Sequence, residues 1–224
     1  ISAGYRMKKD WMNTFHWANQ AAALDNETGM IDLGTLGGSY SYAYGVSADG
    51  SVVVGQARTA MNQDRAFRWT ETTGMVDLGT LGGNYSYATG VSDDGNAVAG
   101  YSYTAASHGH AFRWTEADGM VDLGTLGGTY SYAYGISGDG SAVVGHADTD
   151  SGHSHAFRWT EASGMTNLGT LGGNWSYAYR VNIDGSVVIG YARTEEDHYH
   201  AFRWTEAGGM ADLGTLGGNY SWAS

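Results

Sequence analysis

The stretch Gly74–Gly83 reads GMVDLGTLGG, and close copies of it recur every 45 residues along the chain. The Gly-Met step that opens each copy stands at Gly29, Gly74, Gly119, Gly164 and Gly209. A period in the mid-forties is typical of repeat proteins, whose small units bury their apolar faces only against neighbouring copies. Because 224 residues hold almost five such periods, we expect one repeat domain over residues 1–224.

Each repeat contains four short segments whose side chains alternate in size or polarity. In the third copy these are Tyr130–Ser137 (YSYAYGIS), Ser141–Gly145 (SAVVG), His155–Thr160 (HAFRWT) and Met165–Leu168 (MTNL). Glycine-containing turns such as Gly138-Asp139-Gly140 separate them, which is the pattern of β-hairpins rather than of helices. The sequence therefore predicts an all-β chain of four-stranded antiparallel meanders, the unit of a β-propeller blade.

The two ends of the chain decide the predicted number of blades. Complete blades are expected at about 40–80, 85–125, 130–170 and 175–215. Residues 218–224 match only a first strand, whereas Gly29–Gly34 within residues 1–36 matches a fourth strand. We therefore expect a five-bladed propeller closed by an N-/C-terminal clasp in the fifth blade, which would leave no exposed sheet edge between first and last blades.

The first thirty residues fit the repeat poorly. Phe15-His16-Trp17 resembles Phe112-Arg113-Trp114, which favours strands in this segment. The alternative is a helix that caps or plugs a four-bladed ring, because helical spacing relates Trp11, Phe15, Ala18 and Ala22.

Composition argues against several classes of partner. Eleven basic and twenty-three acidic residues give a formal charge of −12, which opposes binding to nucleic-acid phosphates or to an anionic membrane surface. No apolar run has transmembrane length, so we expect no membrane insertion. The chain has no cysteine, which excludes disulfides and thiol chemistry.

A second repeated motif, HAFRW, precedes four of the five DLGTLGG-type segments. It occurs at His110–Trp114, His155–Trp159 and His200–Trp204, with arginine replacing histidine in Arg65–Trp69. Together the two motifs resemble those of the HAF repeat family, which is found in bacterial extracellular and autotransporter-passenger proteins. The resemblance covers nearly everything after Gly29 and implies a secreted or surface-displayed protein. It carries no catalytic residues that transfer to this chain.

The expected ligand face combines constant and variable segments. An antiparallel blade places the TLGG linkers on the same face as the loops between second and third strands, and those loops differ between copies. Aromatic and amide side chains follow each linker, and a ring beside a hydrogen-bonding group suits a sugar. The predicted ligand-binding residues are Asn84, Tyr85, Tyr130, Asn174, Trp175, Asn219 and Tyr220. The alternative is that these rings pack between blades.

Three histidine pairs are weak candidates for metal binding, since residues i and i+2 of a strand share a face. They are His108 and His110, His153 and His155, and His198 and His200. Asp148, Asp150 or Asp197 would supply a further ligand. We favour a structural role in which the second histidine of each pair hydrogen-bonds a neighbouring backbone group. We accordingly expect no cofactor, with an adventitious divalent metal as the alternative.

The aspartates of the outer strand are assigned a structural role as well. Asn167 replaces aspartate in one copy, which indicates hydrogen-bond acceptance, and we expect pairing with arginines of the adjacent strand. The aspartates are Asp32, Asp77, Asp122 and Asp212, and the arginines are Arg68, Arg113, Arg158 and Arg203.

These observations favour a monomeric, non-catalytic extracellular propeller that binds a glycan or cell-surface ligand. We expect it to be multivalent, with repeated shallow sites on the blades, in the manner of a lectin or adhesin. One alternative is a structural or protein-docking scaffold without a small ligand. The third is a hydrolase or lyase with its site in the atypical N-terminal blade, which holds Lys8, Lys9, Asp10, Trp11 and His16.

Overall fold

The fold was analysed in a computed structural model that describes residues 29–224. These residues form sixteen β-strands and no helix, so no helix among them could span a membrane. The strands make four sheets, each of four antiparallel strands in chain order. The expected all-β class and the four-stranded antiparallel unit are therefore confirmed.

The four sheets have equivalent strands of the same lengths. Sheet 1 contains β1 (Gly37–Val46), β2 (Val52–Thr59), β3 (Asp64–Thr70) and β4 (Gly74–Asp77). Sheet 2 contains β5 (Gly82–Val91), β6 (Ala97–Thr104), β7 (Gly109–Thr115) and β8 (Gly119–Asp122). Sheet 3 contains β9 (Gly127–Ile136), β10 (Ala142–Thr149), β11 (Ser154–Thr160) and β12 (Gly164–Asn167). Sheet 4 contains β13 (Gly172–Val181), β14 (Val187–Thr194), β15 (Tyr199–Thr205) and β16 (Gly209–Asp212).

The Asp-Gly sequences make the turns between first and second strands. In sheet 1 the Asp49 carboxylate accepts hydrogen bonds from Ser51 N and from the hydroxyls of Ser47 and Ser51. The Ser51 N–H bond, together with the two hydroxyl bonds, lowers the pKa of Asp49 to about 2. Gly50 follows with φ of +76°, a conformation that glycine adopts readily. These aspartates thus act in the turn itself, as their sequence context indicates.

A glycine in the second strand lets the first two strands of each sheet approach closely. In sheet 2 the pairing shifts register between Ala88 and Gly90, opposite Gly100. A Cβ atom on Gly100 would lie 1.9 Å from the carbonyl oxygen of Tyr87, so no other residue fits there without displacing the strand. The resulting bulge recurs in all four sheets.

The hydrophobic core lies between successive sheets and repeats with them. Between sheets 2 and 3, Ala99 and Ala111 pack against Ala133, Val143 and Phe157, and all five are fully buried. Equivalent clusters fill the interfaces between sheets 1 and 2 and between sheets 3 and 4. Sheets 2, 3 and 4 each bury one face on the sheet before them, as expected for stacked repeats.

Two polar contacts accompany every interior interface. The buried Ser131 hydroxyl accepts a hydrogen bond from Ala111 N at 2.9 Å and donates one to Gly124 O at 2.6 Å. Arg113 Nε donates to Gly140 O, in the next sheet's Asp-Gly turn, at 3.0 Å. The same pair of contacts recurs one repeat earlier and one repeat later.

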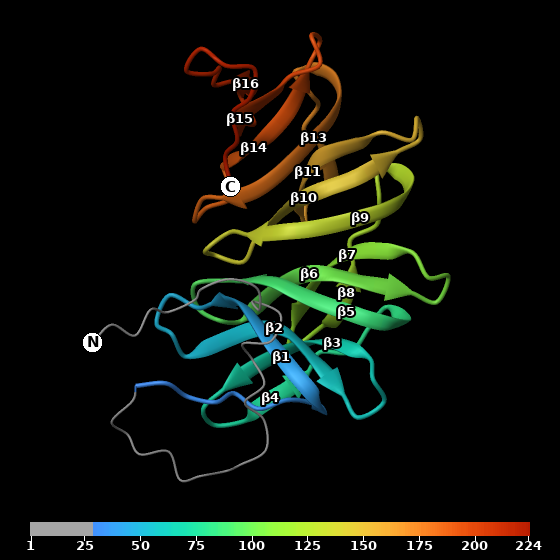
Figure 1. The fold of residues 1–224 in the computed structure, drawn as a ribbon, viewed down its shortest axis with the longest axis vertical. Helices are drawn as coiled ribbons and strands as arrows, with labels where there is room; N and C mark the ends of the chain where they lie inside the picture. Colours follow the sequence, from blue (N-terminus) through green and yellow to red (C-terminus); the bar gives the residue numbers. More distant parts are fainter. Residues whose placement is uncertain (1–28) are drawn as a thin grey trace, which may run out of the picture.

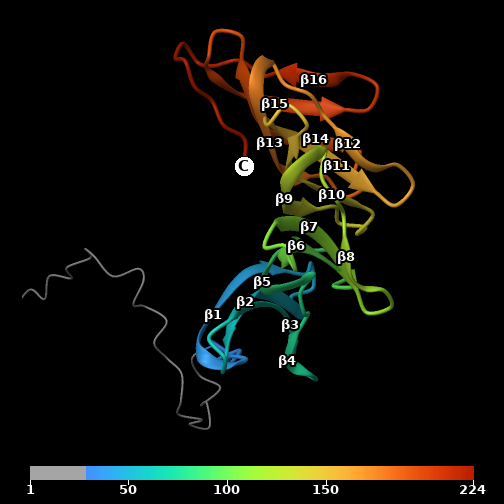
Figure 2. The ribbon, with the colours of Figure 1, turned by 90° about the vertical axis from the view of Figure 1, so that its right-hand side faces the viewer.

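The four sheets form a row that does not close on itself within residues 29–224. Sheets 1 and 4 lie at opposite ends of the long axis (Figure 1), and the side view shows each sheet turned relative to the one before it (Figure 2). The described part of the chain thus shows four sheets where we expected five closed blades. The predicted fourth strand at Gly29–Gly34 forms no strand, and Met30 is 79% exposed. As the outermost strand of its blade, Gly29–Gly34 would pair with one neighbouring strand only. The expected neighbour, Phe15-His16-Trp17, lies outside the described residues.

The C-terminal segment nevertheless lies where a following sheet would begin. The Ser221 hydroxyl accepts from Ala201 N at 2.9 Å and donates to Gly214 O at 2.7 Å. These are the contacts that Ser176 makes one interface earlier along the row and that Ser131 makes two interfaces earlier. Residues before Gly29, including the strands or helix expected there, lie outside the described residues.

Candidate functional site

The second sheet carries an open cavity on the edge where linkers and two–three loops meet. Its volume is about 390 Å³, and its lining comes from the start of β5, the end of β6 and the following loop. The lining residues are Gly82, Gly83, Asn84, Tyr85, Tyr87, Tyr103, Thr104, Ala105 and Ser107. Two of them, Asn84 and Tyr85, are sequence-predicted ligand residues, and none carries a formal charge.

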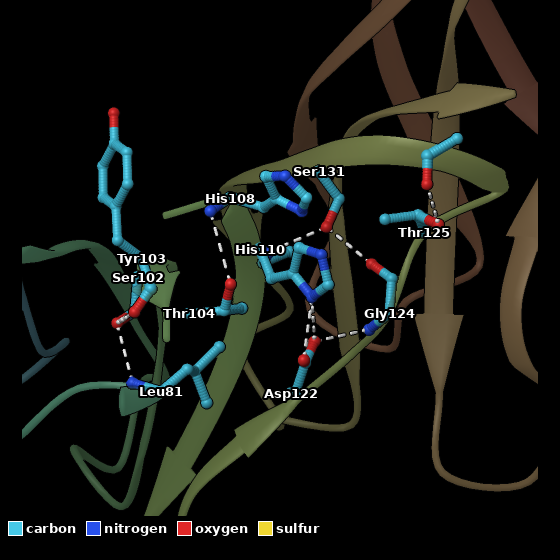
Figure 3. Close-up of polar contacts among 12 residues, drawn as sticks. Leu81, Ser102, Tyr103, Thr104, His108, His110, Asp122, Gly124, Thr125 and Ser131 are labelled. Atoms are coloured by element: carbon cyan, nitrogen blue, oxygen red, sulfur yellow. Dashed lines mark hydrogen bonds and ion pairs between the residues drawn. The ribbon is translucent and has the colours of Figure 1, made fainter. Parts of the chain in front are cut away.

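Two tyrosine rings form a right-angled corner in this cavity. The Tyr85 and Tyr103 ring centroids lie 6.0 Å apart with an interplanar angle of 79°. Tyr85 is 39% exposed. Two backbone hydrogen bonds hold the loop between β6 and β7 in a tight turn. Thr104 N donates to His108 O, and Ser107 N donates to Thr104 O. Figure 3 shows His108 N donating to the Thr104 hydroxyl beside Tyr103.

The remaining predicted ligand residues occupy equivalent places on other sheets, so they do not converge on one pocket. Tyr130 on β9 stacks edge-to-face with His108 from the preceding loop, with centroids 5.6 Å apart. Tyr220 meets His198 in the same way at 6.2 Å. Asn174 and Asn219 are exposed, and Trp175 is partly buried. Each ring thus contributes to its own local site along one edge of the row.

The second histidine of each pair bonds the outer strand, which corrects the expected backbone contact. His110 Nδ1 lies 2.8 Å from Asp122 Oδ2, and Asp122 Oδ1 also accepts from Gly124 N (Figure 3). His200 Nδ1 and Asp212 Oδ2 repeat this contact at 2.8 Å. The separation of twelve residues between histidine and aspartate was the sequence signal for this contact. In the third sheet Asn167 takes the aspartate's place beside His155.

The expected pairing of outer-strand aspartates with adjacent arginines is wrong. In sheet 2, Asp122 stands opposite Phe112, whereas Arg113 stands opposite Val121. Strand alternation therefore puts the carboxylate and the guanidinium on opposite faces of the sheet. The carboxylate meets His110, while the arginine reaches the turn of the next sheet.

The histidine pairs do not assemble into a metal centre in the described structure. Within residues 29–224 no group of three or more histidine, aspartate or glutamate side chains is placed to hold a metal ion. His198 and His200 have ring centroids 6.4 Å apart, and His200 is engaged by Asp212. Lys8, Lys9, Asp10, Trp11 and His16, the residues named for an enzyme site, lie outside the described residues.

A chain of aromatic contacts links the first and second strands of three sheets, and sequence reasoning missed it. At its centre His146 contacts Tyr132, Tyr134 and Tyr177, with centroid distances of 5.2, 5.4 and 4.8 Å. Its Nδ1 is buried without a hydrogen-bond partner. Burial lowers the pKa of His146 to about 4, so the ring is neutral at pH 7.

Sequence reasoning also missed the second wall of the cavity. Tyr103 and Thr104 end β6 and Ser107 lies in the following loop, within the stretch YSYTAASHGH (residues 101–110) that differs between the copies. The available signal was Tyr103 itself, an aromatic residue where the other copies have Arg58, Asp148 and Arg193. That difference could be seen only by aligning the copies residue by residue.

With this geometry in place, the chain can be compared with known proteins. No family model matches it, and no match is found among curated proteins. Solved structures with the same fold include TolB from Acinetobacter baumannii (TM-score 0.57, 15% identity, 81% of this chain and 45% of that one). A protein described as TolB from Agrobacterium tumefaciens has a TM-score of 0.58 and 16% identity, covering 79% of this chain and 66% of that one.

A puromycin hydrolase mutant complexed with PGG has a TM-score of 0.53 and 13% identity, with 83% of this chain covering 29% of that one. At such identities these likenesses establish architecture alone. The chain has a β-propeller-type repeat architecture and spans between about half and two thirds of the length of the two TolB structures.

Proposed function

We propose that this protein is a non-catalytic binding module that recognises glycans through the edge formed by its linkers and two–three loops. The observation that carries the proposal is the cavity at Tyr85 and Tyr103, with Asn84 at its rim. A tyrosine ring offers a flat apolar face to the C–H face of a sugar, and nearby amide and hydroxyl groups bond its hydroxyls.

The polar pairs elsewhere on this edge support a non-catalytic role. The Asp122 carboxylate is shared between His110 and Gly124 N, so this pair ties the third strand of a sheet to the fourth. The pair recurs at His200 and Asp212, as a structural motif of the repeat would.

We further propose that the chain's two ends complete a fifth blade, which closes the row into a propeller. Support comes from the complementary end faces. Ala43 of sheet 1 is exposed, whereas its equivalents Ala88 and Ala133 are fully buried by a preceding sheet. At the other end Arg203 is exposed, whereas Arg113 reaches a following sheet. A fifth blade between these faces would cover Ala43 and give Arg203 a turn to contact.

The repeated arrangement and the resemblance to HAF repeats fit display outside the cell. Secretion or surface display is therefore part of the proposal, as are a monomeric state and a glycan or cell-surface ligand as partner.

The test is a glycan array followed by calorimetric titration of the free sugars that bind. Tyr85→Ala should weaken binding at least tenfold, because it removes the exposed ring. Ile183→Ala is the matched control, since Ile183 is an exposed apolar side chain in a β13–β14 turn on the opposite edge. No binding on a broad array, or equal binding by the Tyr85→Ala protein, would contradict the proposal.

A protein-docking scaffold is the second candidate, favoured by apolar side chains exposed near the C-terminus. Leu213, Leu216 and Trp222 all present large apolar surface in the described structure. If the array gives no sugar and Leu216→Ser abolishes a saturable complex with a purified protein partner, the scaffold replaces the lectin as the better proposal.

A further inference from the structure

One side-chain position separates the second sheet's site from the other three. In each sheet this position is the penultimate residue of the second strand. The residue there lies next to the constant aromatic residue of the first strand. The residues there are Arg58, Tyr103, Asp148 and Arg193, and the corresponding aromatic residues are Tyr40, Tyr85, Tyr130 and Trp175. Only sheet 2 therefore combines an aromatic residue at both positions.

In sheet 1 an arginine covers the constant ring. The Arg58 guanidinium carbon lies 5.2 Å from the Tyr40 ring centroid, and Arg58 Nη1 donates to the Tyr40 hydroxyl. That hydroxyl in turn donates to Asp64 Oδ1 at 2.7 Å. Both the ring face and the phenol are thus engaged within the protein.

Sheet 4 repeats the covering by a different set of contacts. The Arg193 guanidinium carbon lies 5.0 Å from the Trp175 ring centroid and 5.9 Å from that of Tyr199. Arg193 also forms an ion pair with Asp197 in the following loop. A ligand that stacked on Trp175 would have to displace a cation–π contact.

In sheet 3 acidic groups occupy the equivalent space. Asp148 Oδ1 accepts a hydrogen bond from Ser154 at 2.7 Å. Asp150 stands where sheet 2 has Ala105, and a Cβ atom on Gly127 would lie 1.8 Å from its Oδ1. The carboxylate of Asp150 therefore lies directly against the linker.

From these contacts we infer that, among the four described sheets, the second alone holds a saccharide site, at Tyr85 and Tyr103. The penultimate residue of the second strand, Tyr103 in this sheet, determines which sheet binds. The inference rests on the proposed glycan-binding function and narrows it. Equivalent weak sites on every blade were the expectation from repetition, and the side-chain contacts single out the second sheet.

The cavity's chemistry also selects the class of sugar. Its lining has no charged side chain to pair with a carboxylate or sulfate group, and the whole chain carries a charge of −12. A volume of about 390 Å³ lies in the range of small-molecule sites and suits a single neutral pyranose or a disaccharide. The apolar face of the sugar would stack on one tyrosine while its edge met the other.

The experiment is calorimetric titration with a panel of neutral methyl hexosides and N-acetylhexosamines, with glucuronate as the anionic comparison. We expect one equivalent per chain for a neutral sugar and at least tenfold weaker binding of glucuronate. Tyr103→Arg should abolish binding, because it copies the covered sites of sheets 1 and 4 into sheet 2. Arg193→Tyr should add a second equivalent, because it uncovers Trp175.

These variants distinguish a failure of the single-site inference from a failure of the proposed glycan-binding function. Tyr103→Arg places in sheet 2 a residue that two other repeats already carry, so unchanged thermal unfolding serves as its folding control. Binding that survives Tyr103→Arg, or a wild-type stoichiometry of two or more, overturns the single-site inference and leaves glycan binding intact. No binding on the full array overturns the function itself.

Discussion

The interface between sheets 2 and 3 and the outer face of sheet 1 are built from equivalent residues in different surroundings. Ala133 is fully buried at the interface, whereas Ala43 is exposed at the end of the row. The serines Ser131 and Ser41 differ in the same way, since only Ser131 is fully buried and receives a backbone N–H from a preceding sheet. The same motif should therefore contribute more to the free energy of unfolding where a neighbouring sheet covers it than where it is exposed.

Removal of a core ring at an interior interface should have the largest effect. Phe112 is fully buried among side chains of sheets 1 and 2. Phe112→Ala should lower the free energy of unfolding by about 3–5 kcal/mol, because it loses buried area and leaves a cavity. Urea denaturation followed by tryptophan fluorescence measures this.

Val46→Ala is the control for that measurement, since Val46 is 60% exposed on sheet 1. In the described arrangement its effect should stay within about 0.5 kcal/mol, as for other exposed positions, whereas the proposed fifth blade would make the loss larger. Comparable losses from the two substitutions would mean that the outer face of sheet 1 is covered like an interior interface.

Acid should destabilise the protein through His146. The pKa of this buried imidazole is about 4 in the folded chain, below the ordinary value of 6.5, so the folded state favours its neutral form. The contribution is complete above about pH 6.5, is lost as pH falls towards 4, and amounts to roughly 3 kcal/mol. Urea midpoints measured between pH 7 and pH 4 report it.

Gln56 occupies the same position in sheet 1, so His146→Gln is a matched substitution already found in the repeat. The variant should lose this part of the pH dependence. If wild type and variant lose stability in parallel between pH 6.5 and 4, His146 is not the group that titrates.

The fold could be read from the sequence because its determinants are local. Alternating segments such as His155–Thr160 and turns such as Asp139-Gly140 specify strands and hairpins without knowledge of the neighbours. The 45-residue period then requires the hairpins to stack. Closure depends instead on the segment before Gly29, whose sequence departs from the repeat.

The candidate site was predictable only in part, because its contacts depend on side-chain direction. The linker position identified Asn84 and Tyr85, whereas the role of Tyr103 depends on which neighbour covers each ring. The same limit explains the wrong partner for Asp122. The arginine on the adjacent strand suggested an ion pair, and strand alternation selects His110 instead.

Deletion of the buried serine hydroxyl should have a smaller effect than loss of a core ring. Ser131→Ala leaves Ala111 N and Gly124 O without their partner at the interface, which should cost about 1–3 kcal/mol. Ser41→Ala should cost less than 1 kcal/mol in the described arrangement, where the Ser41 hydroxyl bonds only Gly34 O. Thermal unfolding of the two variants gives the comparison. An equal loss at Ser41 would support a fifth blade on sheet 1, and no loss at Ser131 would refute the importance of this contact.

The smallest expected effect concerns the arginines that reach the next sheet's turn. Arg113 Nε donates to Gly140 O at 3.0 Å, and Arg158 repeats the contact with Gly185 O at 2.7 Å, whereas Arg203 is exposed. A hydrogen bond from a charged donor is worth about 1.5–3 kcal/mol when well shielded, and partial exposure reduces this, so Arg113→Gln should cost about 1 kcal/mol. Arg203→Gln should change stability by less than about 0.5 kcal/mol. Differential scanning calorimetry resolves such a difference, and because Arg203 would meet a turn in a closed ring, matching losses at the two arginines would indicate that a further blade lies against sheet 4.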